Sequence, residues 1–259
     1  MREGRVALVT GAGSGLGKAF AELWLDRHGP VVGVDVAAER IEWLNRDLGR
    51  GHPSAGLCAD VTEAAGNEAA VRLAEERFGG LDAVVLSAGI TAWGDIEQLD
   101  MAVYDRVMDV NVRAGALGIR AAAPALRRSD GGSVVLLSST SGTAGEPEHW
   151  AYCTSKAAVA NLARSAAVDL AVAGIRVNVI APGPVHTELT RPIKETQPDK
   201  YDALRRSLPL QRWGEQHEIA EAIAFLALPA SSFVTGAVLP VDGGVTAITA
   251  QLAPREVPL

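Results

Sequence analysis

Short apolar segments alternate with longer helix-forming segments along almost the whole chain, and this alternation limits the fold more than any other feature. Most apolar segments are hydrophobic at consecutive positions, which is typical of strands covered on both faces. We expect strands at Val6–Thr10, Val31–Asp35, Gly56–Ala59, Ala83–Ser87, Val134–Ser138, Arg176–Ala181 and Val238–Val241. We expect helices at Lys18–His28, Ala38–Gly49, Ala64–Phe78, Asp100–Ala123, Ala151–Ala173 and Glu215–Leu228. This order predicts an α/β fold, a doubly wound parallel sheet of seven strands with helices on both faces.

A single domain over residues 1–259 accounts for this pattern, because a chain of this length buries most of its apolar surface in one core. Residues 184–214 interrupt the alternation, since they are polar and contain prolines. Such a segment is either a solvated connection with a short helix or a lid over a ligand crevice, and we expect the lid. The tail, residues 245–259, is expected either to be loose or to dock on a neighbouring subunit.

Charge and cysteine content indicate which classes of partner and which cellular compartment to expect. The 31 acidic residues outnumber the 24 Lys and Arg residues, which argues against nucleic acid, because basic side chains must neutralise its phosphates. No apolar segment approaches the roughly 20 uncharged residues of a membrane span, and no export signal is visible. Cys58 and Cys153 form no CxxC motif or Cys/His cluster, so we expect reduced thiols, a cytoplasmic location and no metal site.

A glycine-rich turn follows the first expected strand and opens the first expected helix. The G-x-G-x-x-G motif fails because Leu16 and Lys18 stand at its third glycine in the two possible registers, and no P-loop G-K-[ST] follows. The pattern that fits is T-G-x-x-x-G-x-G, starting at Thr10. Backbone N–H groups free of side chains, at a helix N-terminus, suit a pyrophosphate. We therefore expect a dinucleotide to contact Gly11, Ser14, Gly15, Leu16 and Gly17.

The ends of the next strands carry further cofactor candidates. Asp35 ends the second expected strand, where a carboxylate accepts hydrogen bonds from the adenosine ribose and repels a 2′-phosphate. No Lys or Arg follows before Arg40, so we expect NAD rather than NADP, the alternative being an exposed acid at a strand end. At the third and fourth strand ends, the residues expected to flank the adenine and admit a ribose are Asp60, Val61, Ser87, Ala88 and Gly89.

Tyr152 and Lys156 lie four residues apart at the start of an expected helix, so they share a face. A nearby ammonium stabilises a phenolate, and we expect it to lower the pKa of Tyr152 into the range of a general acid/base. Ser139 follows the expected strand Val134–Ser138, where its hydroxyl can hydrogen-bond a reacting oxygen. Asn111 lies inside an expected helix, and its amide is either solvated or buried with partners.

Together these motifs resemble the short-chain dehydrogenase/reductase family from about Gly4 to Gly244. The matching residues are Thr10-Gly11, Gly15, Gly17, Asp60, Ala88-Gly89, Asn111, Ser139, Tyr152, Lys156, Pro182-Gly183, Thr235-Gly236 and Val241-Asp242-Gly243-Gly244. One departure is Leu86-Ser87, where the family usually has two asparagines, and it leaves the side-chain support of that corner open.

The resemblance implies a Rossmann-like fold, a nicotinamide cofactor and roles for the matched residues. Tyr152 would exchange the hydroxyl proton, Lys156 would lower its pKa and hold the nicotinamide ribose, and Ser139 would stabilise the developing alkoxide. Asn111 would support a water in a proton relay from Lys156. The nicotinamide carboxamide would be seated by Pro182, Gly183, Val185 and Thr187.

The resemblance also places a substrate pocket beside the catalytic residues. Its expected lining residues are Trp93, Ser141, Glu146, His149, Trp150 and Leu189. His149 could equally be a surface-loop histidine, and the two tryptophans could be packing residues. Relatives are commonly tetramers, so we expect a homotetramer, or a homodimer, that pairs the helices corresponding to Asp100–Ala123 and Ala151–Ala173 and the sheet edge near Val238–Val241.

The expected activity is the NAD-dependent interconversion of a secondary alcohol and a ketone. One alternative is an NADPH-dependent 3-oxoacyl-type ketoreductase, against which Asp35 argues. A second alternative is a non-catalytic dinucleotide-binding regulatory protein, since fold does not fix function. Such a protein would be expected to lack part of the catalytic set, which is complete here.

Overall fold

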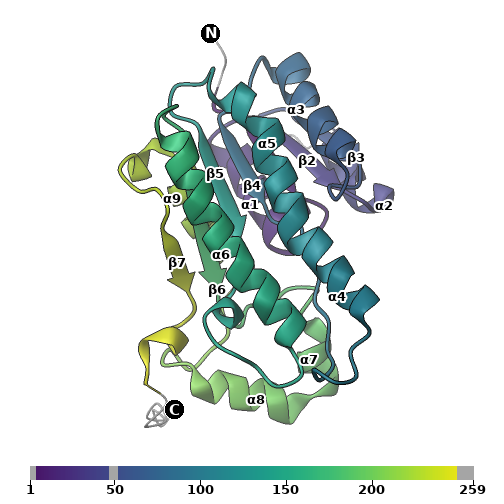
Figure 1. The fold of residues 1–259 in the computed structure, drawn as a ribbon. Helices are drawn as coiled ribbons and strands as arrows, with labels where there is room; N and C mark the ends of the chain where they lie inside the picture. Colours follow the sequence, from purple (N-terminus) through teal and green to yellow (C-terminus); the bar gives the residue numbers. More distant parts are fainter. Residues whose placement is uncertain (1–3, 47–51, 250–259) are drawn as a thin grey trace.

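The computed structural model describes residues 4–46 and 52–249, and within them seven parallel strands form one sheet between two layers of helices (Figure 1). The strands are β1 (Ala7–Thr10), β2 (Val31–Asp35), β3 (Ser54–Cys58), β4 (Ala83–Leu86), β5 (Ser133–Leu137), β6 (Arg176–Pro182) and β7 (Val238–Val241). Their order across the sheet is β3-β2-β1-β4-β5-β6-β7. The predicted doubly wound α/β fold is therefore confirmed.

The two helical layers explain why the strands are apolar at consecutive positions. Leu8 lies in the core beneath one layer, whereas its neighbours Ala7 and Val9 lie in the core beneath the other. Because side chains alternate across a strand, burial on both faces needs a continuous apolar run. The first layer contains α3 (Ala64–Phe78), α5 (Ala114–Leu126) and α6 (Trp150–Ala171), and the second contains α1 (Gly15–Arg27) and α9 (Gln216–Ala227).

The strand order reverses between β1 and β4, which are neighbours in the sheet although β2 and β3 separate them in sequence. Such a reversal leaves a crevice beyond the carboxyl ends of the strands. The glycine-rich turn follows β1, and Ser87, Ala88 and Gly89 follow β4, so both segments border this crevice.

The expected helix Ala38–Gly49 is wrong in its extent. The chain forms α2 (Ala38–Ile41) and then a 3₁₀ turn, η1 (Glu42–Asn45), and residues 47–51 lie outside the described part. Asn45 accepts a hydrogen bond from the Gly56 N–H at 2.7 Å and donates one to its carbonyl at 3.2 Å. The Asn45 side chain thus pairs with the backbone of the edge strand β3, and the 3₁₀ turn η1 brings it there. Pairing with β2 also starts β3 at Ser54, two residues before the expected start.

Residues 184–214 form two helices, α7 (Arg191–Thr196) and α8 (Pro198–Ser207), where one short helix was the simpler expectation. Figure 1 shows both lying across the end of the molecule near which α6 begins. The segment is anchored at its base, where Val185 pairs with Gly214 and the buried Trp213 stacks on Tyr201. Neither helix has a buried residue, so both lie on the surface above that base.

Two further expectations concern membrane spans and the tail, and both can be compared only with the described residues. None of the helices within residues 4–46 and 52–249 is long and apolar enough to cross a membrane. Of the tail, residues 245–249 are described and contain a 3₁₀ turn, η5 (Val245–Ala247), and the remainder lies outside the described residues.

Candidate active site

A cleft of about 360 Å³ opens at the carboxyl ends of the strands, beside the strand-order reversal. It brings together residues between Gly11 and Thr190, and most of the predicted cofactor and catalytic residues line it. These are Gly11, Ser14, Gly15, Leu16, Asp35, Asp60, Val61, Ser87, Ala88, Gly89, Ser139, Tyr152, Lys156, Pro182, Gly183, Val185 and Thr187, and Leu189 of the expected substrate pocket lines the cleft as well. Gly17 and Asn111 are not among the residues that line this cleft.

The glycines of the turn are required by close backbone approach. A Cβ atom on Gly17 would lie 2.4 Å from the Gly11 carbonyl oxygen, so α1 can pack against the turn only with glycine there. Gly11 has a φ of +68°, and a Cβ on it would lie 3.0 Å from the backbone of Ala88. The turn therefore presents bare backbone to the cleft at the N-terminus of α1, which fits a pyrophosphate.

Asp35 closes one end of the cleft and is held by the backbone. Its carboxylate accepts hydrogen bonds from the Gly13 N–H at 3.1 Å and from the Ala37 N–H at 3.0 Å. Arg40 also lines the cleft, and a Cβ on Gly13 would lie 2.6 Å from both the Asp35 carboxylate and the Arg40 Cβ. Arg40 was not predicted at this site, because its position depends on how α2 packs.

The corner after β4 has side-chain support despite the departure at Leu86-Ser87. The Thr10 hydroxyl accepts a hydrogen bond from the Ala88 N–H at 3.2 Å. Asn111 holds Ile90, two residues further along, since it accepts from the Ile90 N–H at 2.8 Å and donates to the Ile90 carbonyl at 3.0 Å. A threonine and an asparagine from other elements therefore hold this segment.

Asn111 lies in a π-helical turn, η2 (Asp109–Arg113), between α4 (Met101–Met108) and α5. The expected helix Asp100–Ala123 is thus wrong at this point, and it also continues through Pro124 to Leu126. The Asn111 amide is buried and donates to the Ser155 hydroxyl at 2.9 Å, so the buried alternative is correct. A Cβ on Gly89 would lie 3.3 Å from Asn111 Oδ1 and 3.4 Å from Lys156 Nζ, so both groups face Gly89.

Tyr152 and Lys156 share a face of α6, as the spacing predicts. Lys156 Nζ lies 5.4 Å from the centroid of the Tyr152 ring and donates to the Leu137 carbonyl at 2.9 Å. Burial raises the pKa of Tyr152 to about 12, partly offset by a hydrogen bond with Ser139, and burial lowers the pKa of Lys156 to about 8. In this arrangement the shift of the Tyr152 pKa runs opposite to the expected lowering, because desolvation of the phenolate is its largest cause.

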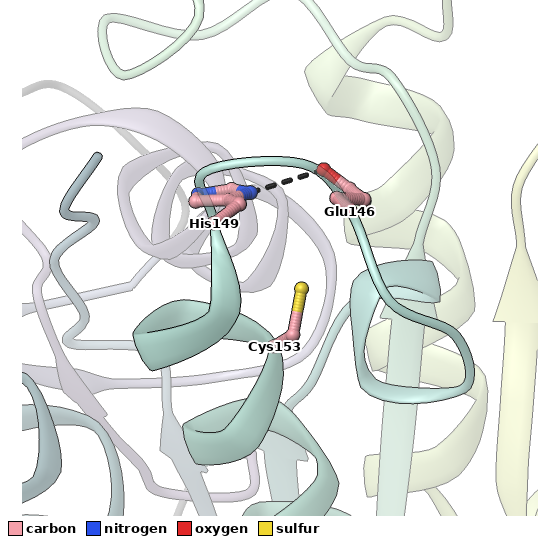
Figure 2. A group of neighbouring side chains, drawn as sticks. All are labelled: Glu146, His149 and Cys153. Carbon is pink, nitrogen blue, oxygen red and sulfur yellow. Dashed lines mark hydrogen bonds and ion pairs between the residues drawn. The ribbon is translucent and has the colours of Figure 1, made fainter. Parts of the chain in front are cut away.

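A chain of hydrogen bonds runs from Ser139 away from the cleft. The Ser139 hydroxyl donates to the Ser141 hydroxyl at 3.1 Å, which donates to Glu146 Oε1 at 2.5 Å. Glu146 Oε2 lies 3.0 Å from His149 Nδ1 (Figure 2). The contacts with His149 and Ser141 hold the pKa of the Glu146 carboxyl below its usual value despite its partial burial. The carboxylate at the end of this chain is therefore ionised at neutral pH.

The aromatic residues expected in the pocket separate into two groups. His149 is buried and stacks between Trp93, at 3.9 Å between ring centroids, and Tyr152, at 4.6 Å. Lys200 of α8 places its ammonium 4.1 Å from the centroid of the Trp93 ring, so a residue of the segment 184–214 reaches this stack. Trp150 instead stacks on Tyr104 of α4 at 5.2 Å, which is a packing contact.

Comparisons with known proteins agree with this geometry. A family model described as enoyl-(acyl carrier protein) reductase matches residues 11–246. The chain is 40% identical over 247 residues to a cis-4-hydroxycyclohexanecarboxylate dehydrogenase of Sinomonas cyclohexanicum, covering 94% of this chain and 97% of the relative. It is 40% identical over 248 residues to an A-factor type gamma-butyrolactone 1'-reductase of Streptomyces virginiae, covering 93% and 95%.

A solved structure gives the same result. Aldohexose dehydrogenase of Thermoplasma acidophilum superposes with a TM-score of 0.85 and 31% identity, covering 99% of this chain and 98% of that chain. The chain therefore belongs to the short-chain dehydrogenase/reductase family of oxidoreductases.

Proposed function

We propose that this enzyme interconverts a secondary alcohol and a ketone with NAD, and that Tyr152 is its general acid/base. The observation that carries the proposal is the convergence of Ser139, Tyr152 and Lys156 on the same cleft as Asp35. The matched relatives named as a cis-4-hydroxycyclohexanecarboxylate dehydrogenase and a gamma-butyrolactone 1'-reductase support the reaction class.

The residues that line the cleft fit a dinucleotide along its length. The bare turn at Gly11 and Gly15 would bind the pyrophosphate, and Asp35 would accept hydrogen bonds from the adenosine ribose. Lys156 would bind the nicotinamide ribose, and Thr187 with its preceding strand end would hold the carboxamide. NAD, when bound, supplies the hydride acceptor.

The chain's own residues supply proton transfer and orientation. Tyr152 takes the hydroxyl proton of the alcohol during oxidation and returns a proton to the ketone oxygen during reduction. The Ser139 hydroxyl turns its hydrogen from Ser141 to the same substrate oxygen and stabilises the charge that develops on it. Asn111 positions the loop at Ile90 through its hydrogen bond. Its side-chain oxygen and the Lys156 ammonium both face Gly89.

The direct test is turnover of a panel of secondary alcohols and polyols with NAD and with NADP, followed by absorbance of the reduced nicotinamide. We expect turnover of at least one alcohol, with a higher kcat/KM for NAD. Absence of turnover with either cofactor across the panel and its matching ketones would reject the proposal.

The second candidate is an NADPH-dependent 3-oxoacyl-type ketoreductase, and Arg40 is the observation in its favour. Its side chain lines the same end of the cleft as Asp35, where a guanidinium would attract a 2′-phosphate. Asp35 is nevertheless the residue whose carboxylate is fixed by two backbone N–H groups at that end, so we place NAD first.

Glu188 of the lid occupies the anion-binding end of α1, where it accepts a hydrogen bond from the Gly15 N–H at 2.9 Å. A phosphate oxygen would need the same N–H, so Glu188→Gln is expected to tighten NAD binding. A charge at a helix N-terminus contributes about 0.3–1 kcal/mol, which corresponds to roughly a two- to fivefold change in Kd. Isothermal titration with NAD measures this change in Kd.

Glu195→Gln is the matched control for this variant, because it removes the same charge from an exposed position on α7. Unchanged affinity in both variants, or weaker binding in Glu188→Gln, would show that Glu188 does not compete with the cofactor.

We also propose that the enzyme is a cytoplasmic homotetramer. Val168 of α6 and Val172, directly after its last residue, are 76% and 96% exposed, and α6 is a helix expected to pair between subunits. Both cysteines are free, as is usual in a reducing compartment. Light scattering that gave the mass of a monomer would contradict the assembly.

A further inference from the structure

Three side chains next to the catalytic tyrosine bring metal-ligating atoms together, although they lie outside the cofactor cleft. One carboxylate oxygen of Glu146, one ring nitrogen of His149 and the sulfur of Cys153 all lie within 4.8 Å of one another. Figure 2 shows the sulfur of Cys153 pointing toward the gap between the other two. His149 and Cys153 are four residues apart at the start of α6, so they share a face, and Glu146 approaches from the preceding loop.

The chemistry of the three donors selects the ion. A thiolate, an imidazole and a carboxylate together suit Zn²⁺, whereas Mg²⁺ prefers oxygen ligands alone. Three protein ligands leave a fourth tetrahedral position open. We propose that Glu146, His149 and Cys153 form a Zn²⁺ site through which the ion reversibly inhibits the enzyme.

The groups behind the ligands are those that such a site requires. His149 Nε2 lies 2.6 Å from the Thr91 hydroxyl, so the ring proton can sit on Nε2 and leave Nδ1 free for the ion. Ser141 donates to Glu146 Oε1, which orients the carboxylate, while Oε2 faces His149. Both side chains are therefore held in place by partners that do not compete for the ion.

The ion can reach these ligands from solvent, and each proton that it displaces has an acceptor. His149 and Cys153 are buried, but the side chain of Glu146 is 42% exposed, so one ligand opens to solvent. The Cys153 sulfur gives its proton to solvent as the sulfur–zinc bond forms. Glu146 Oε2 and His149 Nδ1 lie 3.0 Å apart and are joined by the hydrogen on the ring. Once this proton has moved to Nε2, both atoms are free to bind the ion.

Occupancy of the site would act on the catalytic residues by two contacts. Glu146 ends the hydrogen-bond chain from Ser139, and the His149 ring stacks on Tyr152. A carboxylate and an imidazole that turn toward an ion cannot keep both contacts unchanged. The inhibition rests on the proposed function, whereas Zn²⁺ binding does not.

The experiment measures Zn²⁺ binding by isothermal titration and, separately, inhibition of alcohol oxidation, with the full chain and with Mg²⁺ as the control ion. We expect one Zn²⁺ per chain with a Kd on the order of 1 µM, a fall in turnover of at least about tenfold, and no effect of Mg²⁺. Cys153→Ala should keep the basal turnover and weaken Zn²⁺ binding at least about tenfold. Thr91→Val should weaken binding by about tenfold through the loss of the contact behind His149.

Cys58→Ala is the matched control, because Cys58 is the other free cysteine and lies on the edge strand β3. It should bind Zn²⁺ and be inhibited like the unchanged protein. Equal sensitivity of Cys153→Ala and Cys58→Ala would overturn the proposal, as would absence of Zn²⁺ binding. If no alcohol is turned over but Cys153→Ala alone loses the bound Zn²⁺, the site stands and the proposed function fails.

Discussion

Tyr152→Phe should lower kcat/KM for alcohol oxidation by between about 10²- and 10⁴-fold, the usual contribution of a positioned general acid/base. The substitution removes only the hydroxyl, so the ring can keep its stack on His149 and its place beside Lys156. Affinity for NAD, measured by titration, should change by less than about threefold, because the fold and the glycine-rich turn are untouched. The loss should therefore appear in turnover rather than in cofactor binding.

Tyr104→Phe is the matched control for this variant, because Tyr104 stacks on Trp150 in a packing contact outside the cleft lining. It should retain nearly full turnover. A Tyr152→Phe enzyme that kept the rate of the unchanged protein would assign the proton transfer to another group and remove the basis of the proposed mechanism.

Asp35→Ser should lower kcat/KM with NAD by about 10- to 100-fold, since a hydrogen bond to a charged group contributes about 1.5–3 kcal/mol. The same change should raise activity with NADP, because the carboxylate that repels a 2′-phosphate is gone while Arg40 still lines that end of the cleft. The measurement is kcat/KM with each cofactor. We expect the preference for NAD over NADP to be reversed or nearly lost.

Two controls keep this result interpretable. Asp35 also holds the Gly13 and Ala37 N–H groups, so the Tm of the variant must be compared with that of the unchanged protein. Arg40→Ala should leave NAD use intact and lower NADP use further. An Asp35→Ser enzyme of unchanged Tm and unchanged preference for NAD would mean that another residue selects the cofactor.

The features predicted from sequence are those that depend on short stretches of chain. Continuous apolar runs such as the one ending at Thr10 predicted strands covered on both faces, and the structure confirms the resulting sheet. The spacing of Tyr152 and Lys156 predicted a shared helix face. Where the prediction failed, as at η1 and η2, contacts with distant residues, Asn45 with Gly56 and Asn111 with Ile90, decided the local conformation.

The sequence alone determined the fold class and the edge of the sheet at which the cleft opens, because both follow from the periodicity and order of local elements. Only the tertiary structure decided that Glu188 reaches Gly15, that Lys200 reaches the Trp93 ring, and that Cys153 faces His149. It also decided the direction of the Tyr152 pKa, because burial raises this pKa, the hydrogen bond with Ser139 lowers it, and their balance depends on the surrounding side chains.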